Sequence, residues 1–274
     1  MRHFLAVAAL LATSAVAAAP RPEDELPAAA DLIALAFPKW SDDTDGRLQS
    51  IAPARAAAGG RAKSAARSPS QAASRVQQAI VTPAFVLRAA PGRYVLLATL
   101  QAAGDDGAPE LSQSTPAGLA AYTFTTSASG WKLLKRQEPF DRKGYEGEVR
   151  IEPVRLSDSV QGVVAEYGSC WQGKCGRWIS VYAVSRDGVQ PAAMADVPLA
   201  ADNSARPECA QARRPEEAKG CFRVEGRWHV EPSALAPGAF VIDFGGEPLK
   251  QGLRYQWRGA RYEAGGASPV PKIE

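Results

Sequence analysis

Histidine is nearly missing from this 274-residue sequence, where it occurs only as His3 and His229. Cysteine occurs four times, and no C-x-x-C pair is present, which argues against catalysis of disulfide exchange. The sequence contains no G-x-S-x-G elbow, no phosphate-binding loop and no dinucleotide fingerprint, so we expect no nucleotide cofactor. The 32 basic and 29 acidic residues leave a formal charge of +3, which is too small to indicate nucleic-acid binding.

Long apolar runs are equally scarce, and the one that exists lies at the N-terminus. Arg2 precedes the apolar run from Phe4 to Val16, and small alanines follow it. This layout is typical of a secretory signal peptide, and the run is too short for a permanent membrane span. We therefore predict a signal peptide over residues 1–18. Arginine outnumbers lysine 23 to 9 and alanine is abundant, which indicates a GC-rich bacterial genome and favours the periplasm as the destination.

The even number of cysteines in an exported chain predicts structural disulfides. Pairing by proximity gives Cys170–Cys175 and Cys209–Cys221, which is one of three possible connectivities. Spacings of C-x4-C and C-x11-C, with one histidine left after processing, do not suit a zinc site, so we expect no metal.

Residues 19–80 differ in composition from the rest. A short amphipathic helix is predicted between Pro22 and Trp40, followed by a low-complexity linker over residues 52–68 and a second helix from Ser70 to Ala79. No acidic residue occurs between Asp45 and Asp105, whereas eight arginines or lysines do. This basic arm is interpreted either as a solvated linker or as a contact for anionic lipid or another envelope polymer.

Residues 81–274 have the composition of a β domain. Short runs rich in Val, Tyr, Phe and Trp alternate with Gly, Pro and Asp, and no long helical period interrupts them. This pattern predicts a mainly β fold of antiparallel meanders, arranged as an irregular β-sandwich or an incomplete propeller-like sheet stack. About three degenerate repeats are suggested by Pro83, Pro153 and Pro232, each near a short strand, and Asp187-Gly188 is a hairpin signal.

This pattern of short strand-like runs over residues 81–270 resembles exported proteobacterial proteins with degenerate propeller-like repeats. More remotely, it resembles propeller repeats of the FG-GAP type. The resemblance implies a β-rich fold only. The repeated D-x-D-x-D-G calcium loop of the FG-GAP pattern is not present, so no functional residue is carried over.

The candidates for chemistry are weak. His229 would have to serve any Ser–His–Asp triad, but it lies in a strand-like run. The segment from Ser41 to Gly46 resembles part of a calcium loop but lacks the bidentate glutamate. A paired-carboxylate hydrolase cannot be recognised from spacing, because such a pair is defined in space. The acidic residues near aromatic ones are Glu138, Asp141, Glu146, Glu148, Glu166 and Asp243.

The most informative segment is YGSCWQGKCGRW, residues 167–178. A Cys170–Cys175 bond would make a rigid tip that presents aromatic and cationic side chains, as binding surfaces do. The candidate binding residues are Trp171, Lys174, Arg177 and Trp178. The alternative is a stapled hairpin whose tryptophans cover a sheet edge.

Three functions follow as expectations. The first is a soluble periplasmic binding or accessory protein that docks an envelope protein. The second is an envelope polysaccharide hydrolase that uses two carboxylates. The third is a structural envelope protein tethered by the basic arm. The sequence leaves the ligand and the oligomeric state open.

Overall fold

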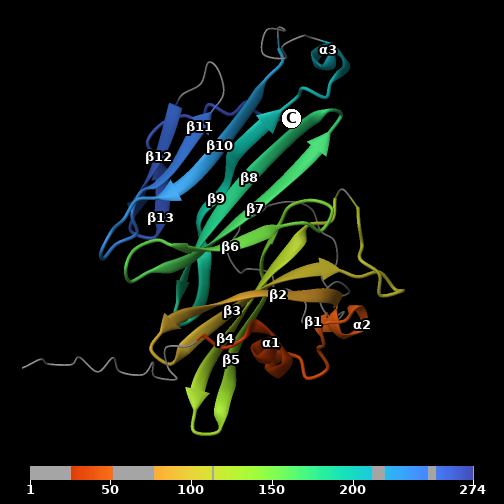
Figure 1. Cartoon of the computed structure of the whole chain (residues 1–274), viewed down its shortest axis with the longest axis vertical. Coiled ribbons are helices and arrows are strands. Elements are labelled where there is room, and N and C mark those ends of the chain that lie inside the picture. The colour runs from red at the N-terminus through yellow and green to blue at the C-terminus, as the bar shows by residue number, and fades with distance from the viewer. Residues whose placement is uncertain (1–25, 52–76, 113, 212–219, 246–250, 274) are drawn as a thin grey trace, which may run out of the picture.

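The fold consists of two antiparallel β-sheets that pack on each other (Figure 1). The structure, a computed structural model, describes residues 26–51, 77–112, 114–211, 220–245 and 251–273. The predicted signal peptide, the linker over residues 52–68 and part of the basic arm therefore lie outside the described residues. Within the described residues, no helix has the length and apolar composition needed to cross a bilayer.

The first sheet has five strands in the order β1-β2-β3-β4-β5, and the second has eight in the order β13-β12-β11-β10-β9-β8-β7-β6. Neighbours along the chain are neighbours in the sheet, which confirms the predicted antiparallel meanders. The strands of the first sheet are β1 (Leu48–Ile51), β2 (Gln77–Ala90), β3 (Arg93–Ala102), β4 (Ala117–Ser127) and β5 (Gly130–Lys143). Those of the second are β6 (Arg150–Arg155), β7 (Gln161–Trp171), β8 (Lys174–Ser185), β9 (Gly188–Asp202), β10 (Arg223–Val230), β11 (Phe240–Gly245), β12 (Gln251–Arg258) and β13 (Arg261–Ala264).

Three short helices accompany the sheets: α1 (Ala29–Ala36), α2 (Thr44–Arg47) and α3 (Pro207–Ala210). The helix α1 lies within the segment predicted as a short amphipathic helix, and it buries Leu32 and Ile33. Of the helix predicted over residues 70–79, residues 70–76 lie outside the described residues, and residues 77–79 belong to the strand β2 instead. Ala79 and Val81 are buried while Gln78 is exposed, a period of two that suits a strand.

The core forms three groups of buried side chains. Leu97 and Leu119 of the first sheet meet Val163 and Tyr182 of the second between the two sheets. A second group lies under α1 on the far face of the first sheet. The third lines the other face of the second sheet, with Phe240 among its largest members. Each fully buried large side chain contributes about 1.5–3 kcal/mol, so the interface between the sheets is part of the stable core.

Turns and prolines differ in detail from the expected repeat. The β8–β9 hairpin forms, but its two loop residues are Arg186 and Asp187, and Gly188 starts β9 with a φ of 105°. Pro83 lies in β2 beside a register shift, Pro153 lies in the edge strand β6, and Pro232 follows β10 in a loop. An edge strand tolerates proline because one side of its backbone needs no partner.

Candidate functional site

A groove of about 860 Å³ lies beside the loop between β5 and β6. Its other side is formed by the C-terminal ends of β7 and β9 and the N-terminal ends of β8 and β10. Residues 145–150 form one wall, and Thr99 of β3 adds to it. The β7–β8 hairpin and neighbouring residues of β9 and β10 form the other side. Figure 1 shows this hairpin running past the region that the first sheet covers. The groove therefore opens where the two sheets diverge.

The register of the second sheet places a row of polar side chains along this groove. Arg177 of β8 pairs with Ala200 of β9, which pairs with Glu225 of β10. Arg177 donates to the carboxylates of Glu166 at 2.7 Å and Glu225 at 2.9 Å. Because β-strand side chains alternate between faces, Glu166 and Arg177 lie on the same face as the row. The guanidinium of Arg177, on β8, thus connects Glu166 of the neighbouring strand β7 with Glu225 of β10, across β9.

The lining of the groove includes many charged side chains. Besides the two pairs of Arg177, two ion pairs among the described residues involve the groove: Arg150 with Glu152 at 3.4 Å and Arg223 with Asp202 at 3.7 Å. Eight of the lining side chains are ionisable acids or arginines: Glu146, Glu148, Arg150, Glu166, Arg177, Asp202, Arg223 and Glu225. Five of them are acidic and three are basic, so the groove carries an excess of negative charge.

The loop wall has an unusual backbone. Glu146 and Gly147 have φ values of 57° and 72°, which is the left-handed pair that a type I′ turn requires. The N–H of Glu148 donates to the carbonyl of Tyr145 at 3.0 Å, and the N–H of Gly147 donates to the carbonyl of Thr115, in the loop before β4, at 2.8 Å. The positive φ of Gly147 favours glycine at this position, whereas a Cβ there would meet only the flexible end of the Gln101 side chain, at 2.8 Å. A non-glycine residue held at positive φ is a feature often found at functional sites.

A polar network lies beside the groove and joins the two sheets. Lys143 of β5 donates to Asp196 of β9 at 2.7 Å, and its ammonium lies 5.7 Å from the ring centre of Tyr167. The Tyr167 hydroxyl donates to Asp196, and Ser180 accepts from the backbone N–H of Asp196 at 3.0 Å. Burial, followed by the bond to Asp196, raises the pKa of Tyr167, so its hydroxyl stays a donor.

Asp141 extends the network. Lys143 lies 3.5 Å from Asp141, which accepts a hydrogen bond from the buried Tyr182 at 2.6 Å. Burial and this bond raise the pKa of Tyr182. For Asp196 burial alone would raise the pKa, but the bonds from Lys143 and Tyr167 outweigh it and the pKa is lowered. The network therefore keeps a charged pair at the junction of the sheets, next to Tyr167 in the groove.

The four predicted binding residues do not share one surface. Trp171 pairs with Lys174 at the hairpin tip, and Trp178 lies on the same face of β8 as Lys174. Trp171 is 59% exposed, whereas Trp178 is half-buried and stacks on Tyr167 at 6.4 Å. Arg177 lies on the opposite face, within the groove. Their role in binding remains a prediction, and a partner would have to wrap around the hairpin to touch all four.

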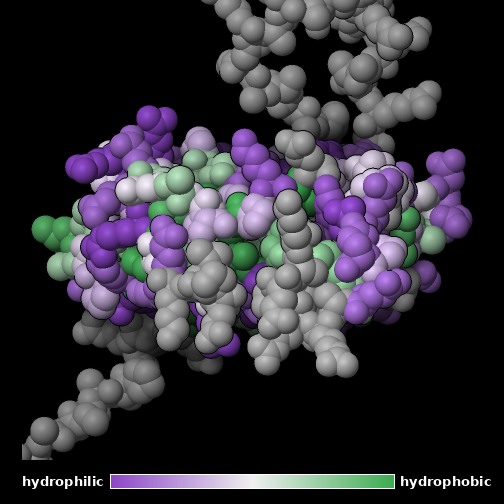
Figure 2. Space-filling model, turned by 90° about the horizontal axis from the view of Figure 1, so that it is seen from above, coloured by the Kyte–Doolittle hydropathy of each residue, from purple (hydrophilic) through white to green (hydrophobic). Residues whose placement is uncertain are grey.

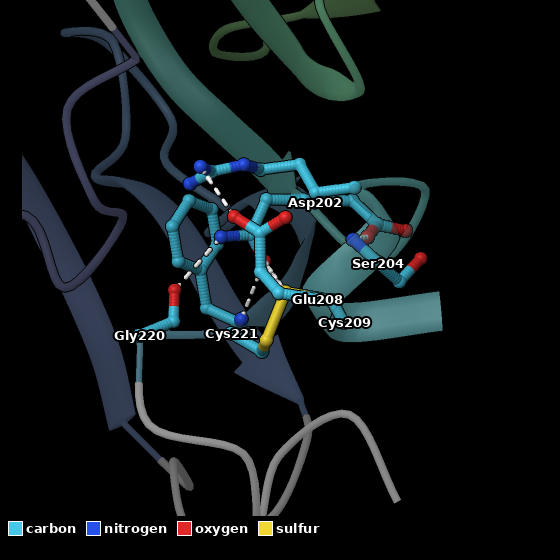
Figure 3. The surroundings of a disulfide bond; sticks show 9 residues. Asp202, Ser204, Glu208, Cys209, Gly220 and Cys221 are labelled. Atoms are coloured by element: carbon cyan, nitrogen blue, oxygen red, sulfur yellow. Dashed lines mark hydrogen bonds and ion pairs between the residues drawn. A yellow bond between two sulfur atoms is a disulfide. The ribbon is translucent and has the colours of Figure 1, made fainter. Parts of the chain in front are cut away.

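Both disulfides have the predicted pairing, Cys170–Cys175 and Cys209–Cys221. The first joins β7 and β8 at the groove. Figure 3 shows the second, which ties α3 to the segment before β10. Beside it, Asn203 donates to the carbonyl of Gly220 at 2.8 Å and accepts from the N–H of Phe222 at 2.7 Å. These contacts fix the entry to β10 and hence the position of Arg223 and Glu225.

The remaining candidates lie elsewhere. Of the six acidic residues named from the sequence, the groove brings together Glu146, Glu148 and Glu166. His229 lies 3.3 Å from Asp243 on exposed positions of β10 and β11. Asp43 caps α2 by accepting from the N–H of Gly46 at 2.6 Å, and this bond lowers its pKa. Among the described residues no cluster of three or more His, Cys, Asp or Glu side chains could hold a metal.

The sequence did not point to Arg150, Asp202, Arg223 and Glu225. A signal existed for the last two, because Arg223 and Glu225 flank the buried Val224 in an alternating pattern. Figure 2 shows the molecule from above, where hydrophilic and hydrophobic residues are interspersed on the surface that grey atoms leave visible. Such a mixed surface suits a contact that is partly polar.

No protein-family model, no curated protein and no solved structure matches this chain. Its function is therefore argued from the groove.

Proposed function

We propose that this chain is a soluble exported protein of the periplasm that binds another envelope protein through the groove between its two sheets. The observation that supports this proposal is a groove of about 860 Å³ whose charged walls are held in place by ion pairs.

The groove is also rigid, which favours recognition. Most of its floor comes from strands, and Cys170–Cys175 fixes the hairpin that forms one side. Arg177 is held by two carboxylates before a partner arrives, so little side-chain entropy is lost on binding. Glu166 and Glu225 each already accept a hydrogen bond from that guanidinium, an arrangement that serves fixed recognition better than proton transfer.

The compartment rests on the signal-peptide pattern and on the two disulfides, which persist in oxidising environments. An exported protein with a preformed groove and a basic arm would meet envelope proteins in the periplasm. The partner's identity is a question for experiment.

Site-specific photocrosslinking tests this proposal directly. A photoreactive phenylalanine analogue replaces Thr99 on the groove wall, and the matched control carries it at Leu235, an exposed loop position outside the groove. We expect one discrete adduct from the Thr99 position in the bacterial envelope and none from Leu235. Equal crosslinking at both positions, or none at Thr99, would refute binding through the groove.

A further inference from the structure

The outer edge of β7 is only partly covered. The neighbouring strand β6 pairs with Gln161–Glu166, and its first residue, Arg150, is the one opposite Glu166. Beyond Glu166, residues 167–171 have β8 on one side and no strand of the described chain on the other. Residues 167–170 line the groove, so the free edge faces into it.

The hairpin register shows which backbone groups are free. Trp171 and Lys174 close a two-residue loop in which Gln172 and Gly173 have φ values of 49° and 75°. The pair that closes such a loop exchanges both backbone hydrogen bonds, and the bonding alternates along the ladder. Cys170 and Cys175 therefore form a non-hydrogen-bonded pair, in agreement with their Cα separation of 4.0 Å.

It follows that the N–H and C=O groups of Gly168 and Cys170 point away from β8, toward the groove. Tyr167, Ser169 and Trp171 direct theirs to β8. Unpaired groups along a strand edge are a template for another extended chain, and the five free residues span about 17 Å. A strand placed there could form four backbone hydrogen bonds with Gly168 and Cys170.

The charges facing this edge indicate the sequence of such a strand. Glu146 and Glu148 on the loop wall are exposed, and within the described residues neither forms an ion pair. Arg177, the cation nearest the centre of the polar row, is already engaged by two carboxylates. The uncompensated charge of the groove is therefore negative and complements lysine or arginine.

We propose that the free edge of β7 binds an extended, basic segment of a partner protein by adding it as a strand to the second sheet. This inference rests on the proposed function and specifies its binding mode. Backbone hydrogen bonds to Gly168 and Cys170 supply the register, and Glu146 and Glu148 select basic side chains.

The probe for this proposal is a fluorescent nine-residue peptide of alternating lysine and threonine, with a glutamate-for-lysine peptide as its control. We expect the lysine peptide to bind and the glutamate peptide not to bind. Glu146→Gln combined with Glu148→Gln should weaken binding about three- to tenfold, and the difference should shrink at high salt. The matched control, Asp105→Asn with Glu110→Gln, removes the same charge from exposed positions outside the groove and should bind as the native chain does.

Amide hydrogen exchange tests the strand itself. With peptide at ten times its Kd, exchange at Gly168 and Cys170 should slow about tenfold, while Ser169, already bonded to β8, should change little. Binding without this protection would overturn strand addition but leave the groove as a binding site. Failure of the peptide to bind, with the Thr99 adduct still formed, would overturn the basic-strand proposal alone. Protection that grows with protein concentration before peptide is added would mean that a second copy occupies the edge, and would also overturn it.

Discussion

We expect the polar network around Lys143 to stabilise the folded protein, because it connects the two sheets that form the groove. Lys143→Met keeps most of the length of the side chain and removes its charge. The change deprives Asp196 of a hydrogen bond at 2.7 Å and Asp141 of a cation at 3.5 Å. Two carboxylates are then left near each other without their common partner.

The size of the effect follows from exposure. An exposed ion pair contributes about 0–1 kcal/mol, whereas breaking a fully buried one costs about 3–5 kcal/mol. The Lys143 side chain is only 10% exposed, but that of Asp196 is 63% exposed, so solvent screens part of the attraction. We therefore expect Lys143→Met to lower the free energy of unfolding by about 1.5–2.5 kcal/mol. For a chain of this size that corresponds to a fall in Tm of about 3–10 °C.

Urea and thermal unfolding at pH 7 measure this loss. The matched control is Arg155→Met, which breaks an exposed pair with Asp158 at 2.9 Å and should cost less than about 0.5 kcal/mol. A double-mutant cycle with Asp196→Asn should give a coupling energy of about 1 kcal/mol. Equal losses in Lys143→Met and the control, or a coupling of zero, would refute the idea that this network joins the sheets.

The same network predicts a pH dependence. The pKa of Asp196 is lowered from its ordinary value of 3.8, so its charge stabilises the folded state at neutral pH. This contribution is complete above about pH 5 and is lost as the pH falls through the lowered pKa. The difference in stability between the native chain and Lys143→Met should therefore shrink below about pH 4. A difference that stays constant from pH 7 to pH 3 would contradict the assignment.

Three further substitutions have expected outcomes. Replacing Cys209 and Cys221 together by serine should lower the free energy of unfolding by about 3 kcal/mol, measured by urea unfolding, because a loop of about a dozen residues is released. Trp171→Ala should leave Tm unchanged within about 1 °C, since a 59% exposed side chain supports little core; a larger fall would show that this tryptophan packs structurally. Arg177→Ala should lower Tm as well as binding, because Glu166 loses its partner at 2.7 Å, and an unchanged Tm in thermal unfolding would contradict the ion-paired arrangement.

The sequence was sufficient for the local features of the fold. Runs rich in Val, Tyr and Phe separated by Gly and Pro predicted antiparallel meanders, and proximity predicted both disulfide pairs. The helix prediction is wrong at its described end, residues 77–79, which belong to β2, because helix start signals are local. The burial of Ala79 and Val81 is instead determined by pairing with β3.

The groove could not be predicted in the same way. It is lined by Glu148 of the β5–β6 loop, Cys170 of β7 and Glu225 of β10, which lie far apart in the chain and share one groove only in the folded protein. The opposite orientations of Arg177 and Trp178, by contrast, follow from strand alternation once the hairpin is aligned. A prediction that treats residues 167–178 as one surface omits this alternation.

The most direct test of binding through the groove is affinity capture from solubilised bacterial envelope with residues 19–274 of the native chain and two variants of this segment, at low and high salt. Ala200→Phe places a ring on the groove floor beside Arg177, and Ala195→Phe makes the same change at an exposed position of β9 outside the groove. We expect the native chain and Ala195→Phe to capture one stoichiometric partner that survives high salt, and Ala200→Phe to capture at least tenfold less of it. Equal capture by all three proteins would contradict binding through the groove.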